Sequence, residues 1–375
     1  MIISQGDEHA LLVEVERFAG RLVEPAVARP EAPMSATTLA ALLSEAESLG
    51  FAGTTAEPTG LAPWEGLGCG GAPGATLSVL TRLARSNVAL AFVVHQRALA
   101  RAVVRHAELD GADAEALAIA PQGRYGLGSV ALARALAGAA LDDDDRAVLA
   151  DVYARDASRV LPLEPDFAAL VTPCVDDDGA LTWQLHSRTQ LVATARPHAH
   201  GLDELMTAEV HTREQGTLAR APSGAARALF VEVLLAHQLG LVAISLGAVE
   251  SVHRRAQRFA AQRHQGGVTI DRHAAVLGLL GRASATMHGS RAALDSMSKR
   301  PLSLAELPSV LALRARAQPA LADAANDALQ VFGGLGYMQE TGAEKAVRDV
   351  NCLRALAGSP RELVLLVAEW ERLHG

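Results

Sequence analysis

The stretch DALQVFGGLGYMQETGAEKAVRDVNCLRALAGS, residues 327–359, carries the most specific pattern in the chain. It predicts a helix that ends at Gly333 and Gly334, a tight loop, a second helix with Arg348 and Asp349, and a loop at residues 358–359. Adjacent glycines let the backbone approach a ligand closely or adopt a positive φ. They are also common where a helix simply ends, so a ligand contact and a plain helix cap are both open for this turn.

The residues around this stretch predict a helical bundle. Residues 225–265 predict one very long helix or a bent pair, with an apolar interior and a basic, polar end. Further helices are predicted over residues 270–298, 302–330, 342–354 and 360–373. Long helices with mostly short connections are typical of an up-and-down bundle. We therefore expect a C-terminal four-helix bundle over residues 223–375.

The first part of the chain is predicted to be helical, and a short middle part is predicted to be β. Residues 9–27, 75–106 and 142–160 have a helical period, and Ser35 starts another helix. The helical period fades from residue 166 to 219. There, residues 168–175 and 180–186 predict two strands joined by an Asp-Gly turn, and residues 189–195 and 205–211 predict more strands.

This order predicts an α+β chain that is mainly α. It is not the repeated βαβ order of an α/β protein. The expected domains are an N-terminal helical domain (1–165), a small β domain (166–222) and the C-terminal helical bundle (223–375).

Composition narrows the function. Half of the 375 residues are hydrophobic and 20% are charged, which excludes a disordered chain. A net charge of −8 and 3% aromatic residues argue against a nucleic-acid partner. Three scattered cysteines provide no disulfide framework, which suits the cytoplasm. Charges interrupt the apolar stretches before about 18 residues, so no membrane span is expected.

Two other patterns are assigned no ligand. Residues 126–131 match a GxGxxA dinucleotide fingerprint, but no strand is predicted before them and no parallel-sheet pattern follows. A group of polar side chains near residue 200 lacks the spacing of a metal site and is interpreted as a solvated loop: His198, His200, Asp203, Glu204 and His211. No metal is expected.

The C-terminal stretch resembles the acyl-CoA dehydrogenase family. It is similar to the family's D-A-x-Q-x-x-G-G-x-G-[YF] run, its E-[KR]-x-x-R-D run and its Y-E-G-T/S turn, without a gap over more than thirty residues. Upstream, residues 259–270 resemble the family's Y-x-x-x-R-x-x-F-G-x-x-I. The domain order also agrees. The resemblance is good from about residue 225 to the end and only architectural before that.

This resemblance implies FAD as the cofactor, held between the β domain and the bundle and shared across a subunit boundary. The residues offered to a neighbouring subunit's FAD correspond to Arg263, Gln330, Gly333 and Gly334. The residues of the turn that contacts the flavin correspond to Gly358 and Ser359. The implied partners are an acyl-CoA or carrier-bound acyl substrate and other subunits, in a homo-oligomer or a hetero-oligomer with a homologous chain.

The residues expected to remove a proton from the substrate are missing. The family's catalytic Glu falls at Ala357, and the alternative position of that Glu, on the long bundle helix, falls at Phe230. Glu232 is two residues away, about 200° around the helix, and therefore faces the other side. Neither Glu340 nor His237 is singled out by spacing as a replacement. We expect a structural role for both.

The β-domain motifs T-E-P-x-x-G-S-D and W-[IV]-[ST]-N are not recognisable either, and the Phe of R-x-x-F-G is Gly266. The half-site for the chain's own flavin thus looks degraded, while the half offered to a neighbour is partly kept. Two functions follow. One is an acyl-CoA dehydrogenase-like flavoprotein oxidoreductase with altered chemistry on an acyl thioester. The other is a catalytically degenerate subunit that completes the FAD site of an active homologous partner.

Overall fold

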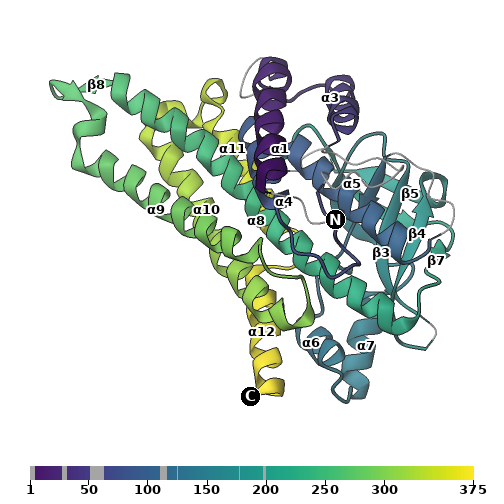
Figure 1. Cartoon of the computed structure of the whole chain (residues 1–375). Helices are drawn as coiled ribbons and strands as arrows, with labels where there is room; N and C mark the ends of the chain where they lie inside the picture. The colour runs from purple at the N-terminus through teal and green to yellow at the C-terminus, as the bar shows by residue number, and fades with distance from the viewer. Residues whose placement is uncertain are drawn as a thin grey trace.

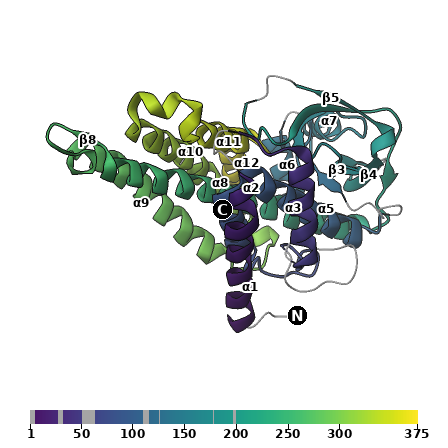
Figure 2. The ribbon, with the colours of Figure 1, turned by 90° about the horizontal axis from the view of Figure 1, so that it is seen from above.

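The computed structural model describes residues 5–27, 32–50, 63–109, 116–124, 126–176, 178–196 and 200–375. Figures 1 and 2 show a long helical bundle that projects from a mixed region of helices and strands. Asp177 and His198, which the sequence analysis placed in a turn and in a polar loop, lie outside the described residues.

The N-terminal part is helical, as predicted. Ser35 begins a helix as expected, because its side chain accepts a hydrogen bond from Thr38 N at 3.1 Å. The helix predicted over residues 75–106 is divided at Asn87, which has extended backbone and caps the second half by accepting from Leu90 N at 2.8 Å. The helices in order are α1 (Gln5–Phe18), the π-helix η1 (Ala19–Val23), α2 (Glu24–Ala26), α3 (Ala36–Ser48), α4 (Thr76–Ser86) and α5 (Val88–His106).

The β region consists of two small sheets, with strand orders β1-β3-β4-β7 and β2-β6-β5. The four strands predicted between residues 166 and 222 are all present: β3 (Ala169–Val175), β4 (Leu181–Ser187), β5 (Leu191–Ala195) and β6 (Met206–Thr212). The short strand β7 (Thr217–Leu218) follows them. The pair β3 and β4 forms the predicted hairpin, in which Cys174 lies opposite Thr182.

Two further strands come from before residue 166, where only helices were expected. Strand β1 (Leu117–Ile119) pairs in parallel with β3, and β2 (Arg159–Leu163) pairs antiparallel with β6. The helix predicted over residues 142–160 is wrong in its second half, since α7 (Asp143–Val152) ends well before Arg159. The buried Arg159 guanidinium instead donates to Pro173 O at 3.0 Å, which ties this segment to the sheet.

The C-terminal part is the predicted bundle. Its helices are α8 (Ser223–Gln262), α9 (Ala274–Met297), α10 (Leu307–Val331), α11 (Ala343–Ala355) and α12 (Pro360–His374). A hairpin of β8 (His264–Gln265) and β9 (Val268–Thr269) forms the tip farthest from the sheets (Figure 1). Short 3₁₀ turns complete the connections: η3 (Ile270–Arg272), η4 (Leu304–Glu306), η5 (Gly333–Tyr337) and η6 (Gln339–Thr341).

Helix α8 joins the two helical parts of the molecule, because it packs against α4 and α5 as well as against the other helices of the bundle. One 18-residue window in it has a mean hydropathy of 1.9, long and apolar enough for a membrane span, which the sequence analysis did not expect. However, 94% of that window is buried inside the protein. The composition of α8 is therefore explained by its place in the core.

A buried ionic cluster attaches the β region to the bundle. Lys345 Nζ lies 2.8 Å from Asp349 Oδ2 and 3.1 Å from Glu204 Oε2, and Asn87 Nδ2 donates to Glu204 Oε1 at 3.0 Å. Asp349 also accepts from Leu202 N at 2.7 Å. Burial alone lowers the pKa of Lys345, but Asp349 and Glu204 raise it above its usual value. The cluster thus joins α11, the start of α5 and the loop before β6.

We predict that Lys345→Met lowers the free energy of unfolding by about 3–5 kcal/mol, because it leaves buried carboxylates without their cation. Urea unfolding followed by circular dichroism measures this change. The control is Lys299→Met at an exposed position beyond α9, which should stay within about 0.5 kcal/mol of the native chain. Equal stabilities of the two variants would show that the cluster does not hold the β region.

Candidate functional site

The six residues expected to contact a flavin form two separate groups. Arg263, Gln330, Gly333 and Gly334 lie at the tip of the bundle, where α8 and α10 end. Gly358 lies in the turn before α12 and Ser359 is the N-cap of that helix. Helix α11 connects the two groups, and its 13 residues span about 20 Å.

The group at the tip is open. Arg263 and Gln330 are exposed, and no atom lies within 4 Å of a Cβ built on Gly333 or Gly334. Gly333 has φ +61°, a conformation that favours glycine. The Phe259 and Phe332 rings, 4.9 Å apart between centroids, pack the two helix ends together beneath these residues. The structure thus brings the four predicted residues to one end of the bundle and leaves them accessible.

The turn before α12 is covered by the chain itself. Gly358 is buried with φ +95°, and a Cβ built on it would lie 2.8 Å from Leu127 Cδ1. Glu362 reinforces this contact, since its Oε1 accepts from Leu127 N at 3.1 Å and its Oε2 accepts from Ser359 N at 2.9 Å. Ser359 and Glu362 together form the capping box of α12. The face of the turn is therefore occupied by residue 127.

The glycines of the GxGxxA pattern belong to this covering segment. A strand, β1, does precede them, which the sequence analysis did not expect. They nevertheless have no room for a phosphate, because a Cβ built on Gly126 would lie 2.2 Å from Glu362 Oε1. Gly128 is the N-cap of α6 (Ser129–Ala137), which packs along α12. A carboxylate at this place repels a pyrophosphate.

No carboxylate occupies the predicted catalytic position. Ala357 is buried and has φ +53°, which is unusual for a residue with a Cβ. Its carbonyl accepts from Gln238 Nε2 at 2.7 Å, and Gln238 Oε1 accepts from Arg314 Nε at 3.1 Å. Arg314 also donates to Leu353 O at 2.8 Å. A buried amide and a buried guanidinium therefore hold the turn by its backbone.

Arg314 was missed by the sequence analysis. Burial lowers its pKa to about 9, and within the described part of the chain it has no carboxylate partner. No signal in the sequence distinguishes it, because Arg316 follows two residues later on the same predicted helix 302–330.

The alternative catalytic position is also filled. Phe230 is fully buried, and its ring packs against Tyr153 and Trp183 with centroids 5.9 Å away in both cases. Glu232 points elsewhere, as its helical position predicted, and accepts from Gly68 N at 2.7 Å. Burial raises the pKa of Glu232. Glu232 therefore does not supply the carboxylate that is missing at Ala357 and Phe230.

His237 is a core histidine, as expected. Trp64 Nε1 can only donate, and it lies 2.8 Å from His95 Nδ1, so this ring nitrogen accepts. His95 Nε2 then carries the proton and donates to His237 Nδ1 at 3.0 Å. Burial lowers the pKa of His95 to about 3 and that of His237 well below its usual value. Both rings are neutral at pH 7. Glu340, the other residue considered as a proton carrier, is exposed near the tip.

We predict that the histidine pair makes the fold sensitive to acid. Since the folded chain resists protonation of these rings, the unfolded chain binds more protons below pH 6.5, and stability falls from there toward pH 3. Each ring contributes a slope of up to about 1.4 kcal/mol per pH unit. Urea unfolding between pH 7.5 and 5 should show a shallower slope for His237→Gln. His288→Gln, at an exposed position, should keep the native slope. An unchanged slope in His237→Gln would contradict the neutral pair.

We also predict that Ala357→Gly raises the free energy of unfolding by about 1 kcal/mol, because glycine adopts a positive φ without strain. The control is Ala355→Gly at the exposed end of α11, which should lower it by about 0.5–1 kcal/mol. Thermal and urea unfolding measure both changes. A loss of stability in Ala357→Gly would show that the turn stores no strain.

Comparisons with known proteins agree with this geometry. The family model for the acyl-CoA dehydrogenase C-terminal domain matches residues 227–370. No curated protein matches the chain by sequence. Solved structures match over nearly the whole length. Butyryl-CoA dehydrogenase from Megasphaera elsdenii has 14% identity and a TM-score of 0.69, covering 98% of this chain and 99% of that one.

Two other structures show the same likeness. A glutaryl-coenzyme A dehydrogenase in complex with glutaryl-CoA has 16% identity and a TM-score of 0.70, covering 98% of this chain and 95% of that one. PigA with FAD and proline has 14% identity and a TM-score of 0.72, covering both chains fully. Residues 227–370 thus match the acyl-CoA dehydrogenase C-terminal domain, and the whole chain has the fold of the acyl-CoA dehydrogenases that it resembles.

Proposed function

We propose that this chain is the non-catalytic subunit of a FAD-dependent, acyl-CoA dehydrogenase-like oxidoreductase, and that it completes the FAD site of a homologous, active partner chain. The observation that carries the proposal is the contrast between the two predicted half-sites. The turn at residues 357–359 has no carboxylate and is covered by Leu127, whereas the residues at the tip are open.

The tip fits part of a FAD molecule. The Arg263 guanidinium is planar and permanently charged, which suits the diphosphate of FAD. The open Gly333 and Gly334 let a nucleotide approach the backbone closely, and Gln330 adds an amide at the same end. FAD accepts a hydride when it is bound in the partner's site. This chain's role is to neutralise the diphosphate and to hold the nucleotide in place.

The turn before α12 does not fit a flavin ring. Leu127 lies against Gly358, and the Glu362 carboxylate is bonded to residues on both sides of the contact. Methyl at Ala357 accepts no proton from an acyl thioester. We therefore assign no chemical step to this turn. The proton and hydride transfers on an acyl-CoA or carrier-bound substrate belong to the partner.

The surface beside the tip supports a protein partner. Helix α9 has only three charged side chains among 24 residues, Arg282, Arg291 and Asp295. Just three of its residues are buried, and Leu277 is 54% exposed. Tyr337 and Met338 near Gly334 are 68% and 50% exposed. Such an apolar surface beside an incomplete cofactor site is the kind that another subunit covers. A homologous chain is the occupant that supplies the rest of the FAD site.

The other candidate is a self-contained flavoenzyme with altered chemistry on an acyl thioester. The likeness to two acyl-CoA dehydrogenases over 98% of the chain favours it. This candidate requires the Leu127 segment to leave the turn before a flavin enters.

The colour of the purified protein separates the two candidates. We predict that the chain alone is colourless, and that a complex with its homologous partner has the visible absorbance of FAD. Arg263→Ala in that complex should weaken FAD binding at least about tenfold, since a charge-assisted hydrogen bond is worth about 1.5–3 kcal/mol. Fluorescence of released FAD measures the affinity.

Two control variants define the outcome. Arg227→Ala, at an exposed position at the start of α8, should leave FAD binding unchanged. Leu127→Ala, at the covered turn, should also leave it unchanged, because no flavin enters there. Stoichiometric FAD in the chain alone, with an affinity that Leu127→Ala changes, would overturn the proposal and support the self-contained enzyme.

A further inference from the structure

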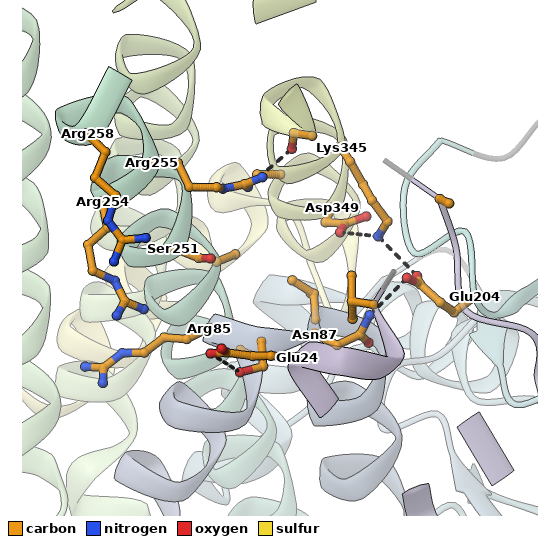
Figure 3. A pocket seen from close by; sticks show the side chains of 18 residues that line it. Glu24, Arg85, Asn87, Glu204, Ser251, Arg254, Arg255, Arg258, Lys345 and Asp349 are labelled. Atoms are coloured by element: carbon orange, nitrogen blue, oxygen red, sulfur yellow. Dashed lines mark hydrogen bonds and ion pairs between the residues drawn. The ribbon is translucent and has the colours of Figure 1, made fainter. Parts of the chain in front are cut away.

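A separate pocket of about 300 Å³ lies where α4 and α5 meet α8 and α11 (Figure 3). It is lined by the second half of α8, the junction between α4 and α5, the start of α11, Glu204 and three N-terminal residues, Glu24, Val27 and Ala32. None of the six predicted flavin contacts lines it. The pocket therefore needs an explanation that is independent of the FAD site.

Three arginines of α8 give one side of this pocket a positive charge. Arg254, Arg255 and Arg258 line it, and none of them has a carboxylate partner within the described residues. Arg255 donates to Thr341 O at 2.7 Å and its Nε has no partner. Arg258 has no hydrogen-bond partner in the described part of the chain. Their charge is thus available to a ligand.

The carboxylates that line the pocket do not neutralise these arginines. Glu204 and Asp349 are already bonded to Lys345, and Figure 3 shows this cluster on the side opposite Arg254 and Arg258. The third lining carboxylate, Glu24, accepts from Ser86 Oγ at 3.5 Å and forms no ion pair with the three arginines among the described residues. A fourth arginine, Arg85, pairs with Glu250, which is not a lining residue. Five cationic side chains line the pocket against three carboxylates, in a chain whose net charge is −8.

The N-terminal ends of two helices add to the positive potential of the pocket. Asn87, the N-cap of α5, and Gly342, the N-cap of α11, both line the pocket. The N-terminus of a helix carries a positive partial charge and favours an anion. Arginine side chains and helix ends thus act in the same direction.

We propose that this pocket binds the phosphoryl group of a small molecule, either a phosphate ester or a diphosphate. Guanidinium groups bind phosphate oxygens through paired hydrogen bonds and stay charged at all working pH values. The volume is at the lower end for a ligand pocket, which suits a phosphate or diphosphate with a small attached group. Arg255 is half-buried and Arg254 and Arg258 are exposed, and all three guanidinium groups line the pocket without a carboxylate partner among the described residues.

Isothermal titration of the full chain with pyrophosphate tests the site, with ADP and inorganic phosphate as further ligands. We expect saturable binding of pyrophosphate that weakens at high salt. The variant Arg254→Gln with Arg258→Gln should bind at least about tenfold more weakly, as the loss of a charge-assisted contact predicts. The matched variant Arg105→Gln with Arg227→Gln, at exposed positions outside the pocket, should stay within about twofold.

Titrations with ADP and with malonate identify which part of the ligand is recognised. Tighter binding of ADP than of pyrophosphate would indicate a nucleotide, and equal binding would indicate recognition of the diphosphate alone. Malonate, a dicarboxylate, should bind more weakly than pyrophosphate. Absence of pyrophosphate binding, equal binding to the Arg254→Gln and Arg258→Gln variant, or equal binding of malonate would overturn the proposal. Circular dichroism confirms that each variant is folded before titration.

Discussion

The contact between Leu127 and Gly358 is the constraint on which the assignment of function depends. It places an apolar side chain against Gly358, where no Cβ stands in the way, and Glu362 accepts hydrogen bonds from Leu127 N and Ser359 N on the two sides of the contact. The packing of α6 along α12 supports the same arrangement. A ligand at this turn competes with a satisfied hydrogen-bond network and a closed apolar contact. The interior of the fold is thus complete at the point where the family resemblance implied a cofactor.

The outer end of the bundle, in contrast, is left uncovered by the described residues. It has open glycines, an exposed arginine and an exposed amide, and the neighbouring α9 buries few of its residues. Surfaces of this kind are incomplete in a single chain. The basic pocket along α8 is a third environment, in which the half-buried Arg255 and the exposed Arg254 and Arg258 have no carboxylate partner in the part of the chain that the structure describes. Helix α8 therefore borders both the open half-site at the tip and the basic pocket that we propose for an anionic ligand.

The sequence predicted the bundle well, because a helical period over many residues and a specific glycine motif both mark it. It predicted β3 to β6 from the Asp-Gly turn and the loss of that period. It did not predict β1 and β2, since short strands whose pairing partners lie far along the chain have no local signal. The sequence proposed residues for the site, and those assignments stay predictions; it did not predict that the turn at residue 358 is covered. The contact of Leu127 with Gly358 joins positions 231 residues apart, and the hydrogen bond from Arg314 to Gln238 joins positions 76 residues apart.

The burial of α8 has a consequence for how the protein is made. The helix contains a segment as apolar as a membrane span, and its partners α4 and α5 precede it in the chain. During synthesis α4 and α5 leave the ribosome first, so the surface that packs against the apolar segment of α8 is available when that segment emerges. The order of elements along the polypeptide thus limits the time for which this segment is exposed to aggregation or to mistaken delivery to a lipid bilayer.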